Sequence, residues 1–215
     1  MVVCIDKVTC VRMHKLLKKC WQNRIDLLTS EVKHAADEQE ELFRRKQIAW
    51  MEETEMVVVI SEEQNEVDKF RKWDLEEEIK EHRRLIREGF ALDDGKRIDL
   101  ESAFKKPDHP FRIAIVCAMW LTGFDVPSLS TLYLDKPLKA HTLMQAIARA
   151  NRVAEGKNNG LVVDYCGILK NLRKALATFA GTGDGGRGGE DGKNDPTRPE
   201  EALLDDLVEA IGFVR

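Results

Sequence analysis

The sequence has no apolar run of membrane-spanning length, and none of its five cysteines forms a CxxC pair. Its opening residues are too short an apolar stretch, and too acidic, to be a signal peptide. Most of the cysteines lie in or beside apolar runs, which favours buried free thiols and a reducing compartment. We therefore expect a cytoplasmic protein without a membrane partner.

The sequence also lacks a phosphate loop of the form GxxxxGKS or GxxxxGKT, and no acidic Mg²⁺ motif of the DExx kind follows an apolar strand. The formal net charge of −4 argues against a wholly basic nucleic-acid-binding module. A basic stripe on an acidic body can still bind a phosphate backbone, and ordinary surface charge is the alternative. The positive charge is local and forms two clusters, Lys15, Lys18, Lys19 and Arg24, and Lys136, Lys139, Arg149, Arg152 and Lys157.

Short apolar runs alternate with longer helical patterns along the chain. Nearly continuous apolar strands indicate a mainly parallel sheet that is covered on both faces, with its ligand site at the carboxyl ends of the strands. Residues 89–110 are expected to be rich in loops, with a turn at 93–95. Strands are predicted at residues 2–5, 24–30, 56–60, 113–117, 130–134 and 160–164, and helices at 9–21, 37–53, 62–87, 139–153 and 168–179.

The length of 215 residues allows one α/β domain and an appendage. We expect the domain at residues 1–179 and a flexible, glycine-rich linker at 180–199. Residues 200–215 carry apolar side chains at helical spacing, which predicts a C-terminal helix as the start of a helical domain. The predicted strand at 2–5 has no preceding turn, which suggests a piece of a longer polypeptide.

One helical segment carries a ladder of polar side chains. At about 100° per residue, Gln145, Arg149 and Arg152 fall within an arc of about 60°. The planar guanidinium group pairs bidentately with phosphate oxygens and keeps its charge. An ordinary solvated helix face is the alternative for such a pattern taken alone. The opposite side of the helix can pack on a core through Leu143, Ile147 and Ala150.

A small turn follows the predicted strand at residues 113–117. Thr122 and Gly123 would let backbone N–H groups approach a phosphate closely, because glycine has no Cβ. Asp125 is a carboxylate that could accept a hydrogen bond from a ribose hydroxyl. Because this turn and the polar ladder both follow parallel strands, we expect them at the same edge of the sheet.

Three segments, TGFDVP at 122–127, LYLDKPLKAH at 132–141 and QAIARANR at 145–152, resemble motifs V and VI of superfamily 2 helicases. More narrowly, they resemble the motor in the restriction (R) subunit of type I restriction–modification enzymes, as does VVVISEEQNE at 57–66. The resemblance extends over residues 1–175. It implies the second RecA-like lobe, a three-layer α/β/α domain with a mainly parallel sheet of about six strands, plus a C-terminal helix after a flexible linker.

The resemblance also implies roles for individual residues. Arg152 would be the arginine finger, Arg149 a second γ-phosphate contact, and Gln145 would position the nucleotide or the attacking water. Asp125 and Gly123 would contact the nucleotide. The metal site would lie outside this chain, since Mg²⁺ and the triphosphate of ATP would be held mainly by the first lobe. Four residues would contact the DNA backbone. The DNA contacts would be Thr122, Thr9, Lys136 and Lys139.

By the same resemblance, the chain is part of a type I site-specific deoxyribonuclease in which ATP-driven translocation precedes cleavage. Its partners would be double-stranded DNA, the first lobe and nuclease domain of its own subunit, and the modification and specificity subunits. Alone it should be inactive, because it has no phosphate loop and no nuclease domain. The alternatives are the second lobe of another superfamily 2 helicase or translocase, and a non-catalytic interaction module. His82 and Arg83 resemble a pair in the same family, and we expect their role to be structural.

Overall fold

The computed structural model describes residues 1–64, 66–121, 123–153, 157 and 159–170. All the helices and strands below belong to one compact unit, Met1–Cys166. A second unit, Gly167–Arg215, is described only at its first residues, 167–170. The predicted linker at 180–199, the predicted helix at 200–215 and most of the predicted helix at 168–179 lie outside the described residues.

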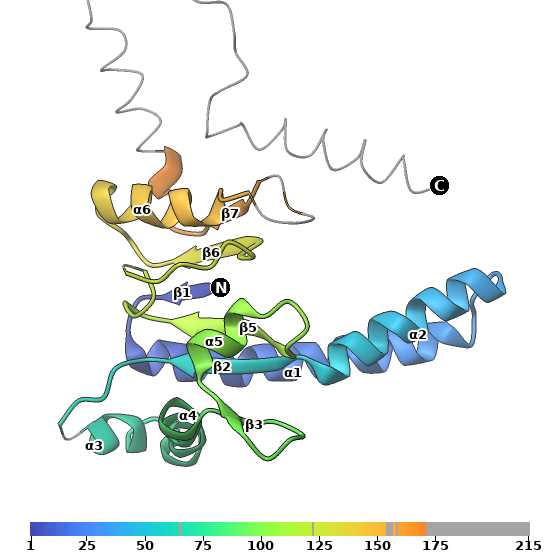
Figure 1. Cartoon of the computed structure of the whole chain (residues 1–215), viewed down its shortest axis with the longest axis horizontal. Coiled ribbons are helices and arrows are strands. Elements are labelled where there is room, and N and C mark those ends of the chain that lie inside the picture. Colours follow the sequence, from blue (N-terminus) through green and yellow to red (C-terminus); the bar gives the residue numbers. More distant parts are fainter. Residues whose placement is uncertain (65, 122, 154–156, 158, 171–215) are drawn as a thin grey trace, which may run out of the picture. The chain divides into compact units, whose positions relative to one another are not determined.

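A parallel sheet of five strands forms the centre of the first unit, in the order β2-β5-β1-β6-β7 (Figure 1). Val2 of the central strand pairs with Ile115 on one side and with Tyr133 on the other. The inner strands β1 and β5 are almost wholly apolar, as expected for a sheet covered on both faces. The strands are β1 (Val2–Cys4), β2 (Glu55–Val59), β5 (Phe111–Val116), β6 (Thr131–Asp135) and β7 (Leu161–Asp164).

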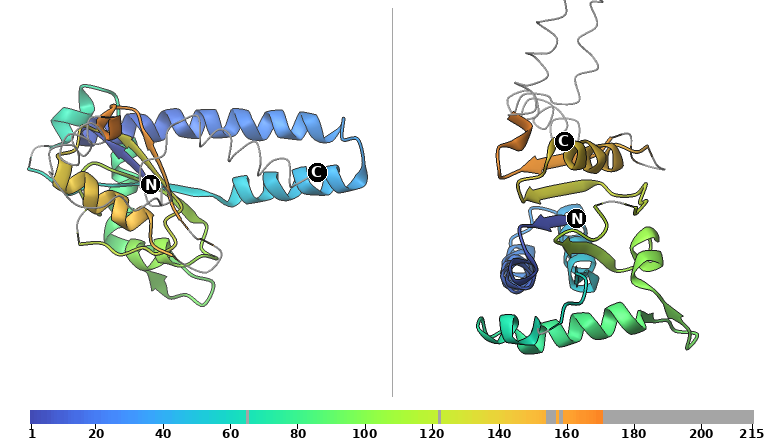
Figure 2. Two further views of the ribbon diagram at one scale, coloured as in Figure 1. Left: turned by 90° about the horizontal axis from the view of Figure 1, so that it is seen from above. Right: turned by 90° about the vertical axis from the view of Figure 1, so that its left-hand side faces the viewer.

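Helices flank the sheet on its two faces, which confirms the predicted α/β fold (Figure 2). On one face lies α1 (Lys7–Val32), which leads into α2 (Glu38–Glu53), and α3 (Glu66–Arg71) and α4 (Glu76–Glu88) lie along the edge strand β2 (Figure 1, Figure 2). On the other side lie α5 (Leu100–Lys105) and α6 (Ala140–Ala150). Among the described residues, no helix is long and apolar enough to span a bilayer.

The segment at 89–110 is more ordered than the sequence suggested. It contains an antiparallel hairpin, β3 (Phe90–Ala91) and β4 (Arg97–Ile98), and helix α5. The predicted turn is confirmed, because Gly95 has a φ of +78° and its N–H donates to the Leu92 carbonyl. Short strands of two residues carry too little periodic pattern to be recognised in a sequence.

The strand predicted at residues 24–30 is wrong, because these residues continue α1. Ile25 and Leu28 are buried against Met51 of α2, and Trp21 packs at the margin of this small core. Trp21, Ile25 and Leu28 have the i, i+4, i+7 spacing of one helix face. The sheet therefore has five strands where about six were expected, and α1 and α2 form a helical hairpin that extends past the sheet (Figure 2).

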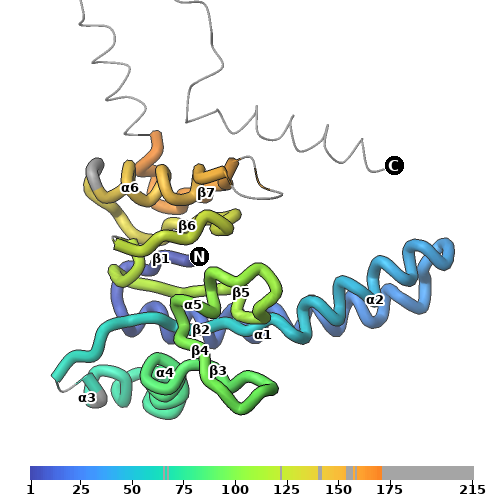
Figure 3. Tube along the Cα trace, in the orientation of Figure 1, coloured from blue at the N-terminus to red at the C-terminus, as the bar shows by residue number. Residues whose placement is uncertain are grey.

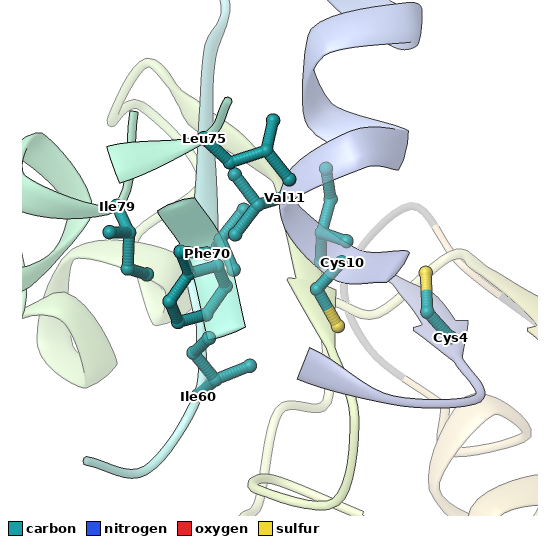
Figure 4. Packing of buried hydrophobic residues seen from close by; sticks show 9 residues of the cluster. Cys4, Cys10, Val11, Ile60, Phe70, Leu75 and Ile79 are labelled. Carbon is teal, nitrogen blue, oxygen red and sulfur yellow. The ribbon is translucent and has the colours of Figure 1, made fainter. Parts of the chain in front are cut away.

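One hydrophobic core lies between the sheet and the helices α1, α3 and α4 (Figure 4). A hydrogen bond with the Cys4 thiol, together with burial, raises the pKa of the Cys10 thiol, so Cys10 is a neutral packing residue. The expectation of buried free thiols holds for Cys4 and Cys10, whereas Cys20 and Cys166 are exposed. The core is made of Cys4, Cys10, Val11, Val58, Ile60, Phe70, Leu75, Ile79 and Ile115.

Candidate functional site: two arginines beside the loop after β5

The sheet places two connecting segments at one edge. Strands β5 and β6 lie on either side of β1, so the chain passes over β1 between them (Figure 3). The loop after β5, residues 117–130, and helix α6 after β6 both begin at the carboxyl ends of these strands. Both segments then run back to the amino ends of β6 and β7, where the Gly160 N–H donates to the Asn151 side chain and the Leu161 N–H to the Ser130 carbonyl. The expected position at the carboxyl edge is therefore wrong for the end of α6.

Helix α6 is held to the sheet by its apolar face. Leu143 and Ala150 are fully buried, whereas Gln145 and Arg149 on the other face are half-buried. The predicted split of the helix into an apolar and a polar side is therefore confirmed. The helix ends at Ala150, earlier than predicted, so Arg152 follows the helix and does not lie on its last turn.

Arg152 forms an ion pair with Asp125 of the loop after β5. The distance from Arg152 Nη1 to Asp125 Oδ2 is 2.5 Å, and the two side chains are 52% and 55% exposed. An ion pair this exposed contributes about 1 kcal/mol or less, because water and salt screen it. A phosphate can therefore displace the carboxylate from the guanidinium group at low energetic cost.

Arg149 contacts the same loop at a second point. Its Nη1 donates a hydrogen bond to the backbone carbonyl of Trp120, at 3.1 Å. Trp120 has a φ of +66°, a left-handed conformation that bulky residues rarely adopt, and its ring stacks on Phe124. The structure thus brings both predicted arginines to the loop that carries Asp125.

Gly123 lies in this loop with a φ of +76°. The left-handed backbone conformation favours glycine at this position. A Cβ built here would meet no atom within 4 Å, so the space in front of the glycine is open. That space allows a ligand to approach the backbone. Thr122, the other predicted turn residue, lies outside the described residues.

Three further predicted residues lie near the carboxyl ends of the strands, away from the end of α6. Lys136 follows β6, and its ammonium group donates to the Cys117 carbonyl at 2.9 Å, so it joins the ends of β5 and β6. Lys139 is exposed at the start of α6. Thr9 lies in the first turn of α1, where its backbone N–H donates to Asp6, the helix N-cap.

Two residues at the site were not assigned a role by sequence reasoning. Trp120 was missed because a left-handed tryptophan has no signature in a sequence. Lys157 was noted only as part of a basic cluster, but its ammonium group donates to the carbonyls of Pro127 and Arg152. Lys157 thereby links the segment after α6 to the loop after β5. Burial lowers the pKa of Lys157.

The structure also has an apolar hollow of about 910 Å³ on the α1 side of the sheet. Its lining includes Trp21, Trp50, Phe111 and Tyr133, and none of the predicted site residues. In the described part of the chain, no group of three or more His, Cys, Asp or Glu side chains could hold a metal ion. Arg149 and Arg152, together with the loop after β5, are therefore the candidate site. Their two guanidinium groups can bind an anion.

A comparison with protein families matches residues 14–167 to a family described as type I restriction enzyme subunit R domain 3. The chain is 52% identical over 95 residues to the type I restriction enzyme HindI endonuclease subunit of Haemophilus influenzae, a match that covers 43% of this chain and 9% of that protein. It is 34% identical over 181 residues to the putative type I restriction enzyme MjaVIIP endonuclease subunit of Methanocaldococcus jannaschii, covering 83% of this chain and 14% of that protein. The chain thus spans only a small part of these relatives. No solved structure matches it.

Proposed function

The chain belongs to the family of type I restriction enzyme R subunits, and from this premise we propose that it is the second RecA-like lobe of an ATP-driven DNA translocation motor. In this proposal, ATP and Mg²⁺ bind against a first lobe elsewhere in the subunit. The lobe described here supplies cationic side chains to the triphosphate. ATP turnover moves the two lobes and pumps duplex DNA past the complex before a nuclease domain cleaves it.

The observation that carries the proposal is the pair of guanidinium groups that contact the loop after β5. Arg152 and Arg149 come from one segment, and each contacts the loop after β5 through a weak or single interaction. Arg152 is the arginine finger in this proposal, and Arg149 is the second γ-phosphate contact. Positive charge fixed in advance near the transferring phosphoryl group stabilises the negative charge of the transition state.

Other residues of α6 and of the loop after β5 have supporting roles in the proposal. Gln145 orients the nucleotide or the attacking water from the half-buried side of α6. Asp125 exchanges its contact with Arg152 for the ribose when nucleotide binds. Gly123 lets the backbone approach the ligand, because the space in front of it is open. Mg²⁺ supplies charge neutralisation when bound, and this chain contributes no ligand to it.

The DNA contacts in the proposal are Thr9, Lys136 and Lys139, which follow the carboxyl ends of β1 and β6, with Thr122 as a further contact. These side chains would meet the phosphate backbone. The double-stranded DNA target would be selected by the specificity subunit, with the modification subunit completing the complex. Backbone contacts of this kind carry no sequence information, which fits a motor that must move along any sequence.

The test is Arg152→Ala in the full R subunit, assembled with the modification and specificity subunits on DNA. We expect DNA-dependent ATP hydrolysis to fall by about 10³-fold or more, as for other arginine fingers, while the complex still binds DNA. Arg45→Ala on α2 is the matched control, because Arg45 is an exposed arginine paired only with Glu41. ATP hydrolysis and translocation near wild type in Arg152→Ala would refute the finger assignment.

The chain alone should not hydrolyse ATP, because its sequence has no phosphate loop. The measurement is phosphate release by the purified chain with and without DNA. Turnover that is present in the chain and lost in its Arg152→Ala variant would show that a single lobe suffices, which contradicts the two-lobe site.

A further inference from the structure

Trp120 has the least favourable backbone conformation for its side chain in the loop after β5. Its φ of +66° lies in the left-handed region, where a Cβ crowds the backbone. A conformation of this kind persists only where the surrounding structure holds it in place. Neighbouring side chains must therefore hold Trp120 in this conformation, which fixes the direction of its carbonyl group.

A column of aromatic rings holds the side chain of Trp120. The Trp120 ring stacks on Phe124, with centroids 4.2 Å apart and planes 11° from parallel. On another side it stacks on Phe104 of α5, at 5.6 Å. Phe104 in turn packs on Phe111 of β5, which is 2% exposed. The ring of Trp120 is thus anchored through α5 to the amino end of β5.

The left-handed backbone determines where the Trp120 carbonyl points. This carbonyl accepts the hydrogen bond from Arg149 Nη1, at 3.1 Å. A change of Trp120 to an ordinary backbone conformation would turn the peptide group and re-aim the carbonyl. Arg149 would then lose its contact with the loop, although α6 itself would stay packed on the sheet.

We propose that Trp120 is a positioning residue for Arg149, and this inference rests on the proposed function. The aromatic column keeps the Trp120 backbone left-handed, and the carbonyl then holds the Arg149 guanidinium beside the loop after β5 before nucleotide binds. Five residues further along the same loop, Asp125 holds Arg152 in the corresponding way. One loop therefore positions both arginines, and the strained tryptophan is its anchor.

Positioning of this kind acts on the chemical step. A guanidinium group that is already in place spends no free energy on reorganisation as charge develops on the γ-phosphate. An interaction that matters only in the transition state changes kcat more than KM. Loss of the Trp120 contact should therefore lower kcat for ATP and leave KM almost unchanged.

The experiment compares Trp120→Phe, Trp120→Gly and Trp120→Ala in the full R subunit within the assembled complex, with kcat and KM measured for DNA-dependent ATP hydrolysis. Phenylalanine keeps a ring for the stack, so kcat should stay within about threefold of wild type. Alanine keeps the steric penalty of the left-handed backbone without the stack, so kcat should fall by about tenfold or more. Glycine adopts the left-handed backbone without penalty, so its kcat should lie between these two.

The order of glycine and alanine separates the two explanations. If Trp120 acts only through the bulk of its ring, glycine should be no better than alanine, and this result would overturn the inference. Phe90→Leu is the matched control, because Phe90 packs on His109 and Phe111 of the same aromatic group without contacting Trp120. A kcat for Phe90→Leu as low as that of Trp120→Ala would point to general damage to the loop and would also overturn the inference.

A double-mutant cycle with Arg149→Ala tests whether Trp120 acts through Arg149. We expect Trp120→Ala to lower kcat no further once Arg149 is absent. A further tenfold loss in that background would overturn the inference and leave the role of Arg149 intact. A normal kcat in the single Arg149→Ala variant would instead refute the proposed role of Arg149 in ATP hydrolysis, and the inference with it.

Discussion

Arg83 of α4 and Glu66 of α3 form a buried ion pair. The distance from Arg83 Nη2 to Glu66 Oε2 is 2.7 Å, and the two side chains are only 6% and 12% exposed. The same guanidinium group donates to the carbonyls of Ile60 and Ser61, directly after β2. Arg83 thereby ties the end of an edge strand to two helices, which supports the structural role expected for it from the sequence.

We predict that Glu66→Ala lowers the free energy of unfolding of the chain by about 3–5 kcal/mol, because it leaves the Arg83 charge buried without its partner. Asp68→Ala is the control, since Asp68 also lies on α3 and pairs with Arg71, but the two side chains are 73% and 62% exposed. Its loss should cost about 1 kcal/mol or less. Urea denaturation measures both, and equal losses would contradict the prediction.

His14 and His82 are a second buried polar pair. Their rings lie 4.4 Å apart in an edge-to-face arrangement, and the side chains come from α1 and α4. Burial, followed by the charge of His14, lowers the pKa of His82 to about 3. Burial and the nearby Lys18 lower the pKa of His14 as well. Both imidazoles are therefore neutral in the folded chain at neutral pH.

Acid should therefore destabilise the fold through these histidines. In the unfolded chain a histidine has a pKa of about 6.5, so below that pH the unfolded state binds protons that the folded state excludes. Stability from the neutral pair is complete above about pH 6.5 and falls toward pH 3, by about 1.4 kcal/mol per pH unit for His82 alone. Urea denaturation between pH 8 and pH 5 measures this dependence.

His82→Leu tests the assignment of the pH dependence. This variant should lose part of the slope of stability against pH, even if its stability at pH 8 is lower. The exposed His34 provides the control variant His34→Gln, which should keep the wild-type slope. A His82→Leu variant with an unchanged slope would show that the acid sensitivity comes from other groups.

The two adjacent leucines of α1 provide a test of the helical hairpin. Leu28 is 2% exposed and packs on Met51, whereas Leu27 is 48% exposed. Leu28→Ala should cost about 2–5 kcal/mol of unfolding free energy, because it removes buried surface and leaves a cavity. Leu27→Ala should cost about 0.5 kcal/mol or less. Similar losses for the two variants would mean that the face assigned to the core is wrong.

Most of the sheet could be predicted because its strands are short runs of buried apolar residues. The apolar face of α6 was equally clear, because Leu143, Ile147 and Ala150 have helical spacing. The run at 24–30 was misread because Ile25, Leu27 and Leu28 look like a buried strand when taken alone. Their membership of a helix becomes clear only when Trp21 is included in the pattern.

The candidate site could be predicted only in part. The sequence indicated that Asp125 and Arg149 lie close together, because both follow parallel strands. It placed them at the carboxyl edge, whereas α6 carries Arg149 back toward the amino ends of β6 and β7. The contacts themselves could not be predicted. The Trp120 carbonyl is available to Arg149 because of a single backbone angle, and that angle depends on packing against Phe104, a residue distant in the sequence.

The hairpin of α1 and α2 gives the domain a stiff lever. With 26 residues at 1.5 Å each, α1 is about 39 Å long. Trp21 donates to the Met51 carbonyl, and the Arg112 guanidinium lies over the Trp50 ring, so the base of the lever is braced against the sheet. From Trp21 to Val32 the arm is about 17 Å long, so a rotation of the sheet about that base displaces the tip by about 0.3 Å for each degree. A rotation of about ten degrees therefore becomes a translation of about 3 Å at the tip of the hairpin.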